Sequence, residues 1–264
     1  NFSMEAIEQT WNGSSTTDGR CTATISRNGD LVHRMYLENT IEYVSAAGSD
    51  VNANPGSALI NEVELEIGGQ KIDKHYGHWL ETWAELTELN KTGHTGTIAD
   101  GSGTTVALGT KLDDGTLFQN MSFMGGVTGL AAGSITSDAH TTLFNVPLQF
   151  WFCRNPGLAL PLIALQYHEV KVIVTFAGND TATSTLLTDT LTSKLWVDYI
   201  YLDTDERRRF AQQSHEYLIE QLQFQQTTSA NAELNFNHPV KELVFIGTPN
   251  ATVTNTAITG PGTP

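Results

Sequence analysis

The sequence predicts an all-β fold, an antiparallel sandwich of eight strands with short helices, on three observations. Its 264 residues include 23 Gly and many Thr, Ser and Asn, a composition that suits numerous turns. Short runs that are apolar or alternate between apolar and polar residues recur between turn signals, which is typical of strands. Helical spacing extends over only one long stretch, His78 to Leu89.

The most apolar part of the chain is the stretch Pro147 to Phe176. It contains two strand-like runs: Val146 to Cys153, apolar at odd and even positions, and Tyr167 to Phe176, in which valines alternate with Lys and Thr. Asn155-Pro156-Gly157 predicts a sharp turn between them. We expect Leu158 to Leu165 to pack back on the layer as one helical turn, so the stretch forms the sandwich interior rather than a pocket.

The first strands follow from alternation and turn chemistry. Phe2 to Trp11 is predicted as a strand that ends at Asn12-Gly13, and Arg20 to Ser26 as the next. Asn28-Gly29 follows, and an Asn-Gly pair between strands favours a type I′ hairpin, with Leu31 to Val44 as the returning strand. Alternation is already under way at Phe2, so we expect the chain to begin inside a domain, with upstream residues missing.

Local signals also define the next elements. Val63 to Ile67 alternates without error, and Glu62, Glu64 and Glu66 are expected on one solvated face. Gly68-Gly69 then turns the chain into Gln70 to Lys74. His78 to Leu89 then predicts an amphipathic helix that caps the sheets, because four apolar residues recur at helical spacing: Trp79, Leu80, Trp83 and Leu86.

Two polar regions interrupt the strands. Residues 90–139 are rich in Gly, Thr and Ser, and only Leu117 to Phe123 resembles a strand, so we expect a functional or mobile loop on an outer face. Gly178 to Ser193 is a second polar loop, and Leu195 to Leu202 a further strand.

The chain after Leu202 predicts a connector and a second domain. Asp203 and Glu206 have the spacing of a capping box, so a short helix should follow. His215 to Phe224 and Val240 to Ile246 are strand-like, but two strands cannot close a sandwich. We therefore predict a first jelly roll over 1–202, a helical connector over 203–213 and the incomplete start of a second jelly roll over 214–264.

Charge and cysteine content restrict the partners and the chemistry. The net charge is −15, and the one basic cluster, Arg207 to Arg209, follows acidic residues, so direct binding of nucleic acid is not expected. No apolar run is long enough for a membrane span. Cys21 and Cys153 lie in strand-like runs and are expected to be reduced core thiols.

Several residues resemble functional sites, but a structural interpretation is favoured for each. His75-x-x-His78 has metal-like spacing without further Cys or His ligands, and Asp203, Asp205 and Glu206 are explained by helix capping. His168-Glu169 has no nucleophile motif nearby. Core packing is favoured over a sugar-stacking platform for four tryptophans: Trp79, Trp83, Trp151 and Trp196. We therefore predict no catalytic, cofactor or metal site, and no enzyme.

Six segments together resemble the major capsid proteins of the large eukaryotic double-stranded DNA viruses, the algal-virus and giant-virus group. They lie in the family's order from Ile7 to Phe245 and read IEQTWNG, ISRNGDLVHRMYLE, LINEVELEIGGQKIDKHYGHWLE, PLQFWFCRNPGLALPLIALQYHEVKV, YLDTDERRRFAQ with HEYLIEQ, and LNFNHPVKELVF. The resemblance implies a structural protein with two tandem jelly rolls, which trimerises into pseudo-hexagonal capsomers and assembles into an icosahedral shell. Relative to that family, the N-terminal segment and most of the second jelly roll are missing.

The resemblance also implies partners and a location. These are further copies of the chain, minor capsid proteins and, in some members, glycans; the protein would assemble in the host cytoplasm and reside in the virion. Asn-x-Ser/Thr sequons occur at five positions, but we expect them to be poor guides to any sugars: Asn12, Asn90, Asn120, Asn179 and Asn250. The alternative function is a carbohydrate-binding module or lectin, because β-sandwiches serve both roles.

Overall fold

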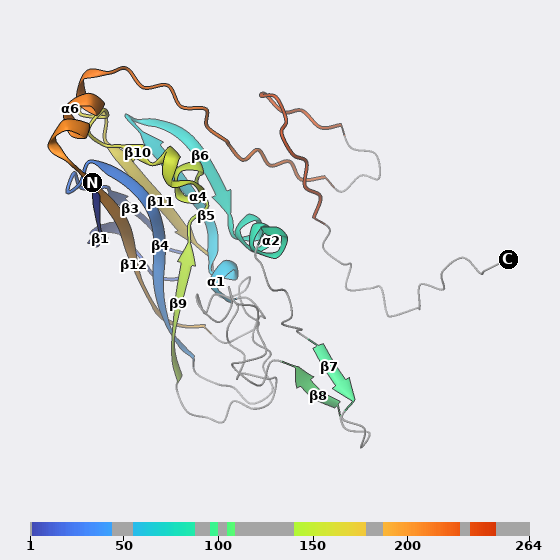
Figure 1. Cartoon of the computed structure of the whole chain (residues 1–264). Helices are drawn as coiled ribbons and strands as arrows, with labels where there is room; N and C mark the ends of the chain where they lie inside the picture. Colours follow the sequence, from blue (N-terminus) through green and yellow to red (C-terminus); the bar gives the residue numbers. More distant parts are fainter. Residues whose placement is uncertain are drawn as a thin grey trace. The chain divides into compact units, whose positions relative to one another are not determined.

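The computed structural model describes residues 2–43, 55–87, 96–99, 105–108, 140–177, 187–227 and 233–246. The chain forms two compact units, Asn1–Leu222 and Gln223–Pro264. The first unit contains two five-stranded antiparallel sheets that pack as a sandwich (Figure 1). The all-β, antiparallel jelly-roll class predicted from the sequence is confirmed.

Sheet one is built around two long strands. β4 (Leu31–Tyr43) and β12 (Leu187–Leu202) pair over most of their lengths, and β1 (Phe2–Gln9) pairs with β12 to form one edge. The other edge of β4 is shared by β9 (His140–Pro147) and β10 (Leu160–Pro161).

Sheet two has the order β2-β3-β11-β5-β6. Its strands are β2 (Trp11–Gly13), β3 (Arg20–Thr24), β11 (Val170–Phe176), β5 (Ile60–Ile67) and β6 (Gln70–Tyr76). Gly68 and Gly69 join β5 to β6 with φ of +61° and +82°, so the predicted Gly-Gly turn is confirmed.

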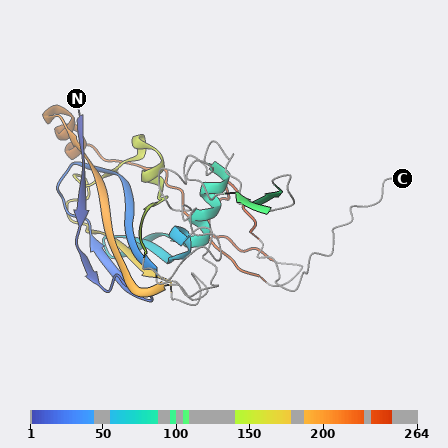
Figure 2. The ribbon, with the colours of Figure 1, turned by 90° about the horizontal axis from the view of Figure 1, so that it is seen from below.

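Short helices lie beside the sheets. α2 (Gly77–Thr87) confirms the predicted amphipathic helix, with Leu80 and Ala84 buried, and lies next to α1 (Pro55–Ala58) (Figure 2). The others are α4 (Trp151–Arg154), the 3-10 turn η1 (Pro156–Leu158) and α6 (Thr204–Gln212). No helix in the described ranges is both long and apolar enough to cross a membrane.

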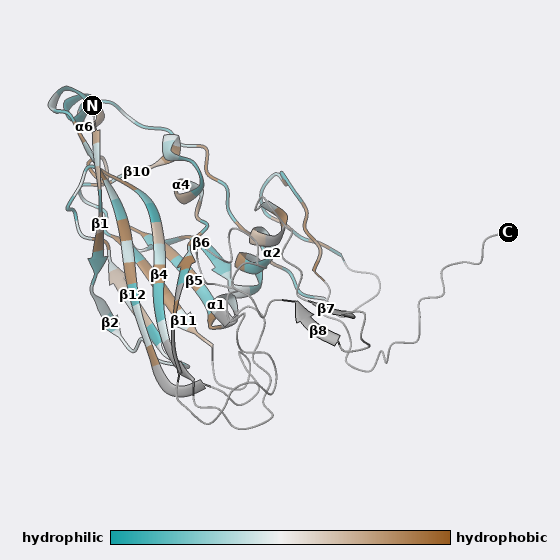
Figure 3. Ribbon diagram, turned by 60° about the horizontal axis from the view of Figure 1, so that its bottom comes forward, coloured by the Kyte–Doolittle hydropathy of each residue, from teal (hydrophilic) through white to brown (hydrophobic). Residues whose placement is uncertain are grey.

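The core lies between the two sheets. Along β11 every second residue is buried, from Val170 to Phe176, as the alternation predicted. Hydrophobic and hydrophilic residues also alternate along β4 and β12 (Figure 3). The largest fully buried side chains are Tyr199, Phe150, Phe152, Phe176, Met35, Leu37, Leu59 and Leu65. Residues from Phe150 to Cys153 are buried, so the central stretch is sandwich interior, as expected.

The hairpin predicted at Asn28-Gly29 is wrong. β3 and β4 belong to different sheets, so this segment crosses between the two layers instead of joining neighbouring strands. Neither residue has a positive φ, and Gly29 is required for a different reason. A Cβ on Gly29 would lie 2.8 Å from the Cβ of Tyr199, so glycine permits the close approach of this crossing to β12.

The strand predicted over Val146 to Cys153 is correct only at its start. β9 ends at Pro147, and Trp151–Arg154 forms the short helix α4. A run that is apolar on every face is buried as a strand or as a helix, so its pattern could not decide between them. The predicted sharp turn at Asn155-Pro156-Gly157 is present as η1, where the Asn155 side chain accepts a hydrogen bond from the Gly157 amide at 2.9 Å. The helical turn expected in Leu158 to Leu165 is present at its end, where the Ala164 and Leu165 amides donate to the Pro161 carbonyl at 3.1 and 3.2 Å.

Three further differences concern the polar regions and the Glu face. β12 begins at Leu187, inside the predicted loop Gly178 to Ser193. Two short strands, β7 (Gly96–Ala99) and β8 (Thr105–Leu108), pair within residues 90–139, whereas the predicted strand Leu117 to Phe123 lies outside the described residues. On β5, Glu64 is buried beneath cations instead of solvated.

The chain after Leu202 begins as predicted and then differs. Asp203 caps α6 by accepting a hydrogen bond from the Thr204 amide at 2.7 Å. The predicted strands His215 to Phe224 and Val240 to Ile246 have no strand assignment, because neither has a backbone ladder partner among the described residues. Within the second unit, side chains replace that ladder. The Gln225 side chain bonds both the carbonyl of Glu233 at 2.6 Å and the amide of Asn235 at 3.0 Å.

Candidate functional site

The His-x-x-His pair does not converge on one point. His75 is buried on β6, stacks on Phe150 with ring centroids 4.8 Å apart, and has its Nε2 3.0 Å from Asp73 Oδ2. His78 is exposed on α2. Within the described parts of the chain, no three His, Cys, Asp or Glu side chains are grouped as metal ligands would be.

One arginine of the basic cluster has an internal partner. Arg207 donates from Nε and Nη2 to the two carboxylate oxygens of Asp30, at 2.8 and 3.0 Å. Asp30 is buried and also accepts the Leu202 amide at 2.8 Å. Hydrogen bonding to Asp30 raises the pKa of the Arg207 guanidinium. This arginine therefore fixes α6 to the sandwich and is not free to bind a phosphate.

Both cysteines are free and buried, as predicted. Burial raises the pKa of Cys21 to about 12 and that of Cys153 to about 12. A thiol with such a pKa is protonated at neutral pH, so neither residue has the reactivity of a nucleophile.

Of the four tryptophans predicted to pack in the core, Trp151 does so and the other three are half-buried. Trp151 is buried, as predicted, and its ring meets that of Phe152 edge-on with centroids 5.2 Å apart. Trp79 and Trp83 are half-buried neighbours on α2, at 5.4 Å, and Arg154 lies over the Trp83 ring at 4.8 Å. Trp196 is half-buried beside Tyr36 on sheet one, at 6.4 Å.

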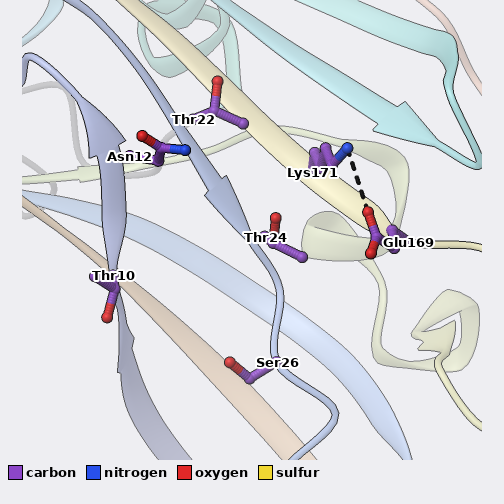
Figure 4. Close-up of a pocket in the computed structure, with 7 residues that line it drawn as sticks. All are labelled: Thr10, Asn12, Thr22, Thr24, Ser26, Glu169 and Lys171. Carbon is purple, nitrogen blue, oxygen red and sulfur yellow. Dashed lines mark ion pairs between the residues drawn. The ribbon is translucent and has the colours of Figure 1, made fainter.

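The outer face of sheet two contains an open polar groove (Figure 4). It has a volume of about 540 Å³ and is lined by Thr10, Asn12, Thr22, Thr24, Ser26, Glu169 and Lys171. Glu169 and Lys171 form an ion pair at 3.3 Å, which gives the predicted His168-Glu169 motif a structural use. Because no aromatic ring lines the groove, it lacks the stacking surface with which lectins commonly hold sugars.

A chain of ion pairs covers the same sheet beside the groove. Glu64 on β5 pairs with Lys71 of β6 at 3.0 Å and with Arg20 of β3 at 3.2 Å, so the carboxylate connects two non-adjacent strands. Lysine and arginine lower the pKa of Glu64 against the effect of its burial. These charges satisfy one another, so this surface has no excess charge to attract a nucleic acid.

Large apolar side chains are exposed at separate places on the first unit. Phe2 is 71% exposed and Met4 48% exposed on the edge strand β1, and Tyr167 is 91% exposed on a loop. Exposed apolar groups on an unpaired strand edge are suited to contact with another protein.

Sequence reasoning missed the burial of two further carboxylates besides Glu64, those of Asp30 and Asp73. Asp30 follows Asn28-Gly29 and looks like a turn residue, and Asp73 occupies an ordinary alternating position. Their partners, Arg207 and Leu222, lie 177 and 149 residues away in sequence. For Asp73 the one sequence signal was a carboxylate at an alternating position of a strand, and Asp30, just before β4, gave none.

Comparison with known proteins identifies the family. The family model described as the major capsid protein N-terminus matches residues 1–203. The model for the large eukaryotic DNA virus major capsid protein matches residues 206–259. Together they cover nearly the whole chain, in agreement with the resemblance found in the sequence.

Individual relatives agree with these matches. The chain is 49% identical to the major capsid protein of Pyramimonas orientalis virus, over 93% of this chain and 56% of that protein. It is 40% identical to the major capsid protein of Paramecium bursaria Chlorella virus 1, over 93% of this chain and 52% of that protein. The chain thus spans about half the length of these relatives.

A solved structure shows the same fold. The crystal structure of PBCV-1 VP54, fitted into a cryo-EM reconstruction of the virophage Sputnik, superposes with a TM-score of 0.64 and 38% identity. The match covers 84% of this chain and 48% of that chain. This chain belongs to the major capsid protein family of the large eukaryotic DNA viruses.

Proposed function

We propose that this chain is the first jelly roll and part of the second jelly roll of a structural virion protein. Three copies of the complete protein form a pseudo-hexagonal capsomer, and the capsomers tile an icosahedral capsid. The observation that carries this proposal is the match of both capsid family models, in order, over 1–203 and 206–259.

The architecture supports a structural role. A sandwich places most strand edges in ladders, so assembly depends on loops and side-chain surfaces rather than on uncontrolled strand pairing. The two thiols are buried, and the carboxylates of Asp30 and Glu64 have structural partners. A stable scaffold with exposed apolar groups at separate points, such as Phe2 and Tyr167, suits repeated contacts between copies.

The proposed partners follow from the same role. They are further copies of this protein in the capsomer lattice, minor capsid proteins and, on exposed loops, possible glycans. The acidic charge of −15 disfavours direct contact with the genome, so other components would face it. The proposed location is the capsid shell, after assembly in the host cytoplasm.

The mass of the native oligomer tests this function. The complete protein, purified at micromolar concentration, should give a mass of three chains and hexagonal particles in negative stain. Tyr167→Ser should weaken the oligomer if its exposed ring contacts a neighbour, with Tyr36→Ser as a control at a half-buried ring. A single-chain mass at all concentrations, together with particles that never appear, would reject the proposal.

A further inference from the structure

The segment that follows α6 lies along the first sandwich as an extended strap, which we define as residues 214–222. Its burial alternates: His215, Tyr217 and Ile219 are partly buried, whereas Glu216 and Leu218 are exposed. Ile219 packs against the main core. This pattern is that of a strand lying on a surface, although the strap forms no backbone ladder in the described residues.

The strap is anchored at β6 by two hydrogen bonds. The Leu222 amide donates to Asp73 Oδ1 at 3.1 Å, and the same oxygen accepts the Lys74 amide at 2.9 Å. The Gln221 side chain donates to the carbonyl of Ile72. Asp73 is buried, so its carboxylate would lose an important donor if the strap left.

The position of Ile72 explains why its carbonyl is available. β5 and β6 pair regularly at Leu65 with Asp73 and at Glu66 with Lys71, which leaves Ile72 without a partner on β5. Ile72 is therefore the extra residue of a β-bulge. Bulges at sheet edges interrupt pairing, and here the strap satisfies the group that the bulge leaves free.

A second anchor fixes the strap to the helices. Glu220 pairs with Arg154 of α4 at 3.2 Å. The Arg154 guanidinium in turn lies 4.8 Å from the centre of the Trp83 ring on α2. The strap therefore contacts β6, α4 and the core at once, and each contact comes from a different one of its residues.

These contacts matter because β6 is the last strand of sheet two. An edge strand presents unpaired backbone groups on which a strand of another molecule can pair. We propose that the strap is an edge guard, which occupies the bulged part of β6 and prevents sheet two from pairing with a second copy of the chain. The inference rests on contacts within the first unit and does not depend on the proposed capsid function.

Substitutions in the strap can remove its contacts with β6 and α4 without changing any residue of the sheets. Leu222→Pro removes the one amide that Asp73 accepts from the strap, and the double variant Glu220→Ala with Gln221→Ala removes both side-chain anchors without a backbone constraint. Leu218→Pro is the matched control, because Leu218 is 89% exposed in the same strap.

Hydrogen exchange and light scattering on the full chain test the proposal. Both release variants should speed amide exchange about tenfold over the β6 edge, where the Lys74 amide donates to the same Asp73 oxygen, as expected for the loss of a bond to a carboxylate. They should also associate with increasing concentration, whereas Leu218→Pro should behave like the unchanged protein. Equal exchange rates in the release and control variants would contradict the attachment of the strap to β6. Faster exchange with no association would overturn its role as a guard.

Discussion

Arg207 and Asp30 join the connector helix to the sandwich through two parallel hydrogen bonds, at 2.8 and 3.0 Å, between a guanidinium and a buried carboxylate. Paired bonds of this kind fix orientation as well as distance. The Leu202 amide binds the same carboxylate, so the end of β12 and the first turns of α6 share one anchor.

Asp30→Ala should lower the free energy of unfolding by about 2 kcal/mol, since it removes a charged acceptor that serves two elements. Arg207→Ala should cause a smaller loss, because its guanidinium is exposed and screened by salt. Urea denaturation measures both effects, and Arg208→Ala on the exposed face of α6 is the control. A loss for Arg208→Ala as large as that for Asp30→Ala would contradict the anchor.

Phe152→Ala should lower the free energy of unfolding by about 3 to 5 kcal/mol, because a large side chain with 0% exposure leaves a cavity in the core. Phe2→Ala, at a position 71% exposed, should change it by about 0.5 kcal/mol or less. Thermal or urea unfolding distinguishes the two variants. Similar losses in both would mean that the sandwich interior is assigned to the wrong residues.

Cys21 and Cys153 should resist thiol reagents until the protein unfolds, because burial raises the pKa of each to about 12. Stability should also fall as the pH rises from 9 toward 12, since the unfolded thiols ionise first and the folded ones keep their protons. Labelling rates in native buffer and in urea check the first point. The free energy of unfolding of Cys21→Ala should fall less steeply over the same pH range, which checks the second point. Rapid labelling of the native protein would refute both.

The protein should show no measurable binding to duplex DNA near physiological salt, because its net charge is −15 and Arg207 is already paired. A gel-shift titration at micromolar protein is sufficient to test this. A shift that weakens as salt is added would contradict this prediction.

Limited proteolysis should give a resistant fragment that ends just after Leu222. The domain division predicted from the sequence would place the cut in the connector 203–213, but the contacts of Ile219, Gln221 and Leu222 hold the strap on the first unit. Mass spectrometry of the fragment locates the cut. Cleavage before Ser214 would favour the earlier boundary, and the division into 1–202, 203–213 and 214–264 stays a prediction until then.

Local chemistry was readable from the sequence wherever a few neighbouring residues decide the structure. Gly68-Gly69 needs positive φ, and Asp203 caps the helix next to it, so both features were predicted correctly. Alternation placed β11 and its buried face for the same reason.

Features that depend on distant residues could not be read in this way. Asn28-Gly29 has the composition of a hairpin, yet its conformation is set by Tyr199 on another strand. The fully apolar run before Arg154 is buried on all sides, so burial could not distinguish helix from strand. The anchors at Asp30 and Asp73 were invisible because their partners lie more than a hundred residues away.

The pairing of β1 with β12 affects how the protein folds during synthesis. Phe2 pairs with Leu202 and Gln9 with Leu195, so β1 is synthesised about 190 residues before the strand with which it pairs. At ordinary rates of synthesis the gap is about 10 to 40 s, during which β1 has no native partner. Such non-local contacts also slow folding itself. A cell that makes many copies of this chain must therefore protect β1 until β12 has been synthesised, and the yield of folded protein should rise with chaperone capacity and fall with temperature.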